Sequence, residues 1–155
     1  MALLKWTDEL SVGIDIIDKQ HMILVRAINL MGMAVEKGSE RELMSAIFET
    51  LTDYTVTHFS YEEELFTHFG YEEEAKHKKT HEALIDQLNM LKEEFEDGED
   101  NLGPEVLKFL VTWLQKHIMG TDKLYAPIVI EGMEKQAKEE KKKKQQQEKD
   151  ERLEE

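Results

Sequence analysis

The sequence predicts an all-α protein, an up-down-up-down four-helix bundle with an N-terminal arm and a charged C-terminal extension. Three observations favour this fold. Apolar residues recur every three or four positions in four long stretches, and no stretch alternates with period two over a useful length. Most of the two prolines and eight glycines lie between these stretches, which indicates short loops. Four amphipathic helices joined by short loops are typical of an up-down-up-down bundle.

The first two helices are delimited by capping residues and glycines. The first is predicted from Asp18, a candidate N-cap, to Gly38. Residues 39–42 read Ser-Glu-Arg-Glu, which has the form of a capping box. A second helix therefore follows and continues to about Phe69, before Gly70.

The third and fourth helices show similar signals. The third is predicted from Glu72 to Asp97, and Gly98 follows it. The fourth begins at Pro104, because proline suits the first position of a helix.

The two ends of the chain differ from the bundle in composition. Residues 1–17 include the apolar Trp6, Val12 and Ile14, so this arm is expected to pack across the bundle. Residues 134–155 are rich in charge and offer no apolar face, so they form either a frayed helical extension or a disordered segment. The sequence thus divides into a bundle domain, residues 1–133, and a tail, residues 134–155.

Composition and charge exclude several classes of function. The chain has 155 residues and no cysteine, so disulfides, thiolate zinc sites and iron–sulfur clusters are excluded, and any metal must bind to histidines and carboxylates. The formal net charge of -14 lies in the body of the chain, because basic and acidic residues balance in the tail. An acidic body disfavours nucleic acid and anionic lipid as partners. No secretory signal or apolar membrane-spanning stretch is visible, so a cytoplasmic protein without membrane insertion is expected.

Five of the six histidines and one glutamate occupy positions that the periodicity assigns to the helix interior. They are His21, His58, Glu62, His77, His81 and His117. One buried histidine is usually satisfied by a neighbour, but this set leaves many polar atoms that need partners, and a metal satisfies them together. In an antiparallel bundle the four regions that carry them lie at the same end. Only His68 falls outside the pattern.

A second carboxylate is needed to balance the charge, and Asp122 supplies it. It follows His117 by five residues, which on an ideal helix places it roughly 140° away from the histidine. Gly120 lies between them and can break or loosen the last turn, so that the chain folds back and directs Asp122 toward the site.

Five imidazoles and two carboxylates are too many ligands for one tetrahedral zinc. They suit two iron ions (Fe2+/Fe3+) bridged by Glu62, Asp122 and an oxo or hydroxo oxygen. If His77, His81 and His117 share one iron, the other iron has an open position where dioxygen binds.

Four blocks of the sequence, in order and spacing, resemble the hemerythrin family, in particular its single-domain bacterial members, the bacteriohemerythrins. The blocks are VGIDIIDKQH (12–21), HFSYEEELF (58–66), HKKTH (77–81) and WLQKHIMGTDKLY (113–125). The resemblance implies that the seven residues named above are the iron ligands, with Glu62 and Asp122 bridging, and that dioxygen binds reversibly for storage or delivery, without enzymatic turnover. It also implies an apolar oxygen pocket of Leu24, Phe59, Trp113, Leu114 and Ile118. The sequence departs from the family at Glu72, where proline is frequent, and in the charged tail.

Two other functions remain open. The same site could serve an oxygen or redox sensor that acts through a protein partner, whose identity the sequence does not give. A di-iron oxidase of the ferritin-like kind needs two Glu-x-x-His pairs on two helices. Only Glu74 and His77 have this spacing, so an oxidase is the less favoured alternative.

Overall fold

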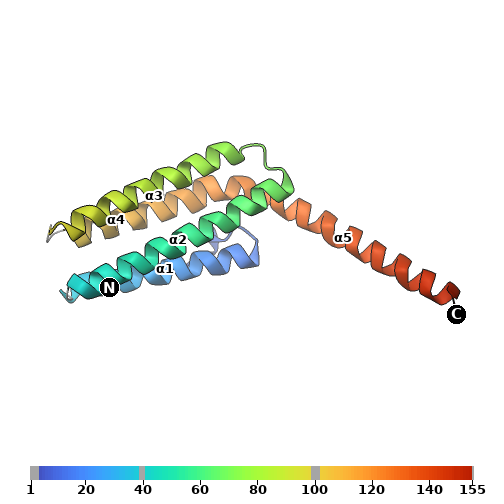
Figure 1. Ribbon diagram of the computed structural model, residues 1–155, viewed down its shortest axis with the longest axis horizontal. Helices are drawn as coiled ribbons and strands as arrows, with labels where there is room; N and C mark the ends of the chain where they lie inside the picture. The colour runs from blue at the N-terminus through green and yellow to red at the C-terminus, as the bar shows by residue number, and fades with distance from the viewer. Residues whose placement is uncertain (1–3, 39–40, 99–101, 155) are drawn as a thin grey trace.

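The computed structural model describes residues 4–38, 41–98 and 102–154, and it confirms the predicted all-α fold. Four antiparallel helices form a bundle, and the last of them continues through a π-helical turn into a helix that projects from one end (Figure 1). The elements are η1 (Asp8–Leu10), α1 (Asp15–Glu36), α2 (Arg41–Phe69), α3 (Glu74–Glu96), α4 (Leu102–Lys116), η2 (His117–Asp122) and α5 (Lys123–Glu154). No strand occurs in these described ranges.

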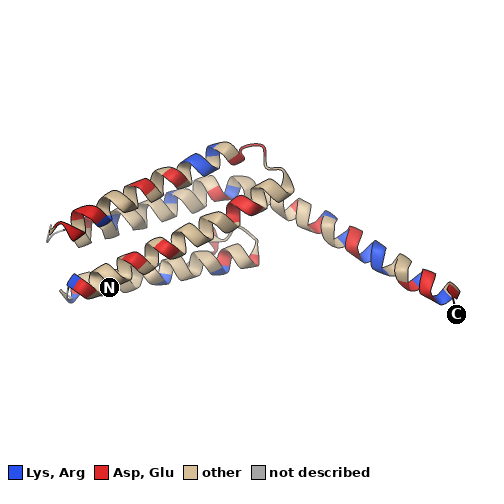
Figure 2. Ribbon diagram, in the orientation of Figure 1, with Lys and Arg blue, Asp and Glu red and all other residues tan. Residues whose placement is uncertain are grey.

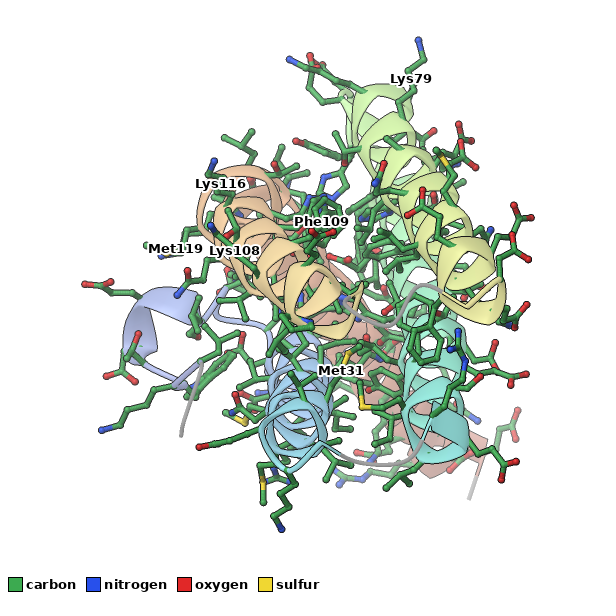
Figure 3. All side chains as sticks on the ribbon, turned by 90° about the vertical axis from the view of Figure 1, so that its left-hand side faces the viewer. Met31, Lys79, Lys108, Phe109, Lys116 and Met119 are labelled. Atoms are coloured by element: carbon green, nitrogen blue, oxygen red, sulfur yellow. The ribbon has the colours of Figure 1, made fainter. Side chains whose placement is uncertain are left out.

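One apolar face of each helix forms the core, as the periodicity predicts. Buried residues at these positions include Ile28 and Met31 of α1, Leu51 of α2, Leu88 of α3 and Leu110 of α4. Seen along the bundle, Met31 lies in the interior between α1 and α2 (Figure 3). Each large aliphatic side chain buried in this way contributes roughly 1.5–3 kcal/mol, so the core is sufficient to hold polar groups in fixed positions at one end.

The N-terminal arm packs on the bundle through backbone and side-chain hydrogen bonds. The Leu4 N–H donates to Asn29 Oδ1 at 3.1 Å, and Asn29 Nδ2 donates to the Leu4 carbonyl at 2.8 Å. Asp18 differs from its predicted role, because α1 begins at Asp15 and Asp18 lies inside it. Its carboxylate instead accepts the Val12 N–H at 2.9 Å, and so ties the arm to the first turn.

The first part of α5 packs against the end of α2. Tyr125, Ala126 and Val129 are buried. Gly132 approaches Phe69 so closely that a Cβ on the glycine would lie 2.3 Å from the Phe69 ring, so no larger residue fits unless the ring or α5 moves. The bundle packing therefore extends about ten residues past the π-helical turn.

Beyond that contact the tail is helical and exposed. Of the two alternatives predicted for residues 134–155, the structure shows a helix that reaches Glu154, with every described side chain from 134 onward exposed. Basic and acidic residues are mixed along it (Figure 2). Gln136 and Gln146 donate to carboxylates four residues later, a spacing that stabilises isolated helices. Across the described residues, none of the helices is both long and apolar enough for a membrane span.

Deletion of residues 136–155 is expected to leave the bundle folded, because these side chains contribute no buried apolar surface. The midpoint of thermal unfolding and the metal content of the purified protein should match those of the full chain. A deletion that begins at Tyr125 is the control, since it also removes the buried Tyr125 and Val129 and should lose both properties. A large loss in the shorter deletion would show that the tail is structural.

Candidate metal centre

All seven predicted ligands meet at the end of the bundle from which α5 projects. They form two overlapping groups of buried side chains that share one glutamate. The first group is Glu62, His77, His81, His117 and Asp122, and the second is His21, His58 and Glu62. The start of α1, the end of α2, the start of α3 and the π-helical η2 that follows α4 supply them, as the up-down topology predicts.

Asp122 reaches the site because the chain winds as a π-helix from His117 to Asp122. A π-helical turn closes hydrogen bonds between residues five apart, so residues i and i+5 lie over one another rather than on different sides. The predicted loosening of the turn is present, but the chain does not fold back, and Gly120 does not adopt a positive φ. The helix stays continuous and turns Asp122 inward by widening.

The Asp122 carboxylate lies between the two groups. Its Oδ1 is 3.0 Å from His77 Nε2 and 2.9 Å from His117 Nε2, whereas its Oδ2 is 3.2 Å from His21 Nε2. Each oxygen thus faces the imidazoles of a different group, which is the arrangement that a bridging carboxylate requires.

Glu62 occupies the other side of the site. Its Oε1 is 3.0 Å from His58 Nε2 and 3.5 Å from His81 Nε2, so it also contacts an imidazole of each group. Its Oε2 accepts a hydrogen bond from the Tyr125 hydroxyl. Burial raises the pKa of Tyr125, so the phenol stays protonated and remains a donor to this carboxylate.

The donor atoms have the spacing that metal ions require, and several of them lack any other partner. Two ligands at right angles with bonds of about 2.1 Å lie about 3.0 Å apart, and the contacts above range from 2.9 to 3.5 Å. His81 Nε2 and His117 Nε2 also face each other at 3.2 Å. Several buried atoms lack a hydrogen-bond partner, among them both nitrogens of His21 and His77 and both oxygens of Asp122. Unpaired buried polar groups are costly, and a bound cation would pair them.

The electrostatics of the site suit cation binding. Burial, together with the neighbouring His117 and His77, lowers the pKa of His81 to about 2, so this imidazole is neutral and its lone pair is available. Burial alone would raise the pKa of the Asp122 carboxyl, but His117 and two further imidazoles beside it hold that pKa well below its usual range. The site therefore presents a neutral nitrogen at His81 and an ionised carboxylate at Asp122.

Two residues that orient the candidate ligands were missed by the sequence analysis. Gln20 Oε1 lies 2.6 Å from His58 Nδ1 and accepts from it in the tautomer whose Nε2 is free to bind a metal. Tyr125 is the other. Both lie within the quoted sequence blocks, Gln20 one residue before His21 and Tyr125 three residues after Asp122, and Tyr125 continues the buried face past the turn. Its position three residues after Asp122, on the same face of a helix, was the signal from which Tyr125 could have been found.

Two polar residues considered from the sequence lie outside the site. His68 is exposed and contacts Gln136 Oε1 at 3.2 Å. The Glu74 carboxylate accepts a hydrogen bond from the Thr67 hydroxyl at 3.0 Å and belongs to neither ligand group. The spacing of Glu74 and His77 therefore does not produce a second Glu-x-x-His pair at the centre.

The five residues of the predicted oxygen pocket are placed around the ligands. Leu24, Phe59, Leu114 and Ile118 are buried, and Trp113 is half-buried. The Phe59 ring stacks on His81 with centroids 3.7 Å apart, and the Trp113 ring stacks on His117 with centroids 4.2 Å apart. Apolar and aromatic surfaces thus enclose the imidazoles, and a role for them in oxygen binding stays a prediction.

A four-helix bundle with histidines and bridging carboxylates gathered at one end defines a class of helical-bundle metalloproteins. The family model described as hemerythrin HHE cation binding domain matches residues 12–129. The chain belongs to the hemerythrin family.

Known relatives agree over most of the chain. A bacteriohemerythrin of Stenotrophomonas maltophilia is 36% identical over 139 residues, which cover 90% of each protein. A bacteriohemerythrin of Methylococcus capsulatus is 32% identical over 128 residues, or 82% of this chain and 97% of the relative. A crystal structure of wild-type hemerythrin matches with a TM-score of 0.78 and 31% identity, and covers 83% of this chain and 98% of that one.

Proposed function

We propose that this protein binds dioxygen reversibly at a centre of two iron ions, for oxygen storage or delivery. The observation that carries the proposal is the division of five imidazoles into two buried groups that share Glu62, with the Asp122 carboxylate lying between them. Glu62 and Asp122 would bridge the two ions, together with an oxo or hydroxo oxygen. When bound, the iron pair supplies the redox chemistry that holds and releases dioxygen.

The unequal division of the imidazoles supports binding at one of the two positions. His77, His81 and His117 face one position, whereas only His21 and His58 face the other. The second position therefore has room for a further ligand. Nitrogen-rich ligation favours reversible binding over oxygen activation, which supports a carrier rather than an enzyme.

The surrounding residues orient the ligands and exclude water. Gln20 fixes the His58 ring and Tyr125 holds the Glu62 carboxylate, so both ligands are preorganised. Leu24, Leu114 and Ile118 add apolar surface and offer no hydrogen-bonding groups from their side chains. A pocket without water favours release of dioxygen as such over transfer of an electron from the iron to dioxygen.

Native purification is expected to yield two irons per chain, with no other first-row metal at comparable occupancy, because the ligand set serves two ions. Metal analysis by mass spectrometry and an absorption spectrum recorded before air, in air and after removal of oxygen would test this. A spectrum that changes in air and returns under argon supports reversible binding. One metal per chain, or stoichiometric zinc, contradicts the di-iron proposal.

A sensor built on the same site is the second candidate, and the exposed helix of residues 134–154 favours it, since this helix is free to contact a partner. The chain has no cysteine, so single cysteines can be introduced for spin labels on α2 and on the tail. A label distance that changes on oxygenation would indicate a sensor. An unchanged distance would favour storage or delivery.

A further inference from the structure

One aromatic ring connects the candidate ligands with the protein surface. The rings that contact candidate ligand imidazoles and belong to no ligand are Phe59, Phe66, Tyr71, Tyr125 and Trp113. The first four are at most 6% exposed. Trp113 is half-buried, so among the described residues it is the one ring of this set with an edge open to solvent.

The contact between Trp113 and the site is direct. Its ring stacks on His117, with centroids 4.2 Å apart and planes inclined by 14°. His117 in turn belongs to the group of three imidazoles, and its Nε2 lies 2.9 Å from Asp122. A path of two stacked π-systems therefore joins the surface to the donor atoms of the centre.

The surface of α4 around Trp113 has an unusual charge for this protein. From Val106 to Lys123 the charged side chains that reach solvent are all lysines, since Asp122 is buried. Lys116 follows Trp113 by three residues, so the two are neighbours on the helix, and Lys108 and Lys116 point outward from α4 (Figure 3). Asp8 and Glu9 border this stretch, because η1 packs against η2. The chain as a whole has 34 acidic and 20 basic residues, so an anion is repelled less here than over most of the molecule.

A reversible oxygen carrier needs a route for electrons as well as for oxygen. Slow oxidation leaves two Fe3+ ions, and each must gain one electron to return to Fe2+. From the stacking of Trp113 on His117 and the lysines on the surrounding surface, we propose that Trp113 is the electron entry point. Through it an anionic one-electron donor reduces the oxidised centre. Two donors lose one electron each for every chain that is restored. This inference rests on the proposed di-iron centre, but it does not require that dioxygen bind.

The sign of the effect of Trp113 substitutions separates this route from direct entry of the reductant. Oxidised protein is mixed anaerobically with dithionite, whose active form is the one-electron donor SO2•−, and the loss of the Fe3+ absorption is followed. If Trp113 carries the electron, Trp113→Leu slows reduction several-fold, and Trp113→Phe, which keeps a ring, recovers most of the rate. If the reductant diffuses into the pocket, the smaller side chain opens access and Trp113→Leu speeds reduction, which would overturn the proposal.

A charge substitution tests the surface itself. Lys116→Glu should slow reduction by dithionite about fivefold at low ionic strength, the effect of changing one charge by two units at about 8 Å in water. Reduction by the methyl viologen radical cation should become faster. Lys142→Glu in the exposed tail is the matched control, because it changes the net charge equally and should alter neither rate. Equal effects of both substitutions would show that net charge, not this surface, governs the rate.

Accessibility of the ring can be measured without iron chemistry. Trp6 and Trp113 are the two tryptophans, so Trp6→Phe leaves Trp113 as the single tryptophan, which can be excited selectively over the tyrosines. Its emission should be quenched more by iodide than by caesium, and Lys116→Glu should reverse this order. An emission that neither ion quenches would mean that Trp113 is closed to donors, and the proposal would fail even if the protein bound oxygen normally. If Trp113 carries electrons in a protein that shows no oxygen spectrum, the proposed function fails and this inference stands.

Discussion

Glu62→Ala is expected to abolish most iron binding, with metal per chain falling from two toward zero. The reason is that Glu62 is the residue common to both ligand groups, so its loss removes an oxygen ligand from each ion. It also leaves the buried Tyr125 hydroxyl without its acceptor, which costs further stability. Iron per chain after native purification, together with a circular dichroism spectrum to confirm helicity, is the measurement.

His68→Ala is the control for that experiment. His68 is the sixth histidine, its side chain is exposed, and its contact is with Gln136 rather than with the site. The His68→Ala variant should retain two irons per chain. An equal loss of iron from His68→Ala and Glu62→Ala would show that the ligand set is wrongly assigned.

Leu114→Ala is expected to retain iron but to lose the oxygenated state much faster. Leu114 is 4% exposed and lies one turn before His117, so it covers the same end of the bundle as the ligands. Its truncation costs roughly 2–5 kcal/mol of stability and opens a cavity that admits water near the open iron position. Water helps reduced oxygen to leave and strands the iron as Fe3+. Decay of the oxygenated absorption band in air, at one pH and temperature, measures this.

Leu110→Ala separates the pocket effect from the loss of stability. Leu110 is equally buried, at 4% exposed, but lies a further turn from the ligands along α4. It should destabilise the protein to a similar degree and leave the decay rate close to that of the parent. Equal decay rates for Leu114→Ala and the parent, with iron retained, would mean that Leu114 does not protect the site.

The fold could be predicted because each bundle helix buries one periodic face, and because α1, α2 and α3 each end just before a glycine. The prediction of the convergent histidines followed from the same periodicity, since a polar residue at an apolar position must find a partner. Helix starts were less accurate. Asp18 has the identity of an N-cap, but its carboxylate is used by the arm, which packs back on the helix. A tertiary contact of this kind is not encoded in local spacing.

The placement of Asp122 and of the residues that orient the ligands could not be derived from ideal helix geometry. A constant 3.6 residues per turn places Asp122 on the side of the helix that faces away from the site. No local feature of the sequence predicts that the chain winds as a π-helix from His117 to Asp122. The contact between Gln20 and His58 joins two different helices, so it depends on their packing distance. These details are set by the assembled core rather than by either segment alone.

The π-helical turn also determines how α5 is rotated about its own axis. If His117–Asp122 were rewound as a regular α-helix, with one residue's worth of twist restored, α5 would turn by about 100° about its axis. Tyr125 would then leave Glu62, Gly132 would no longer face Phe69, and the exposed part of the helix, about 30 Å long at 1.5 Å per residue, would present different side chains to each side. The face that the tail presents to a partner and the geometry of the ligands thus both depend on the winding of the chain from His117 to Asp122.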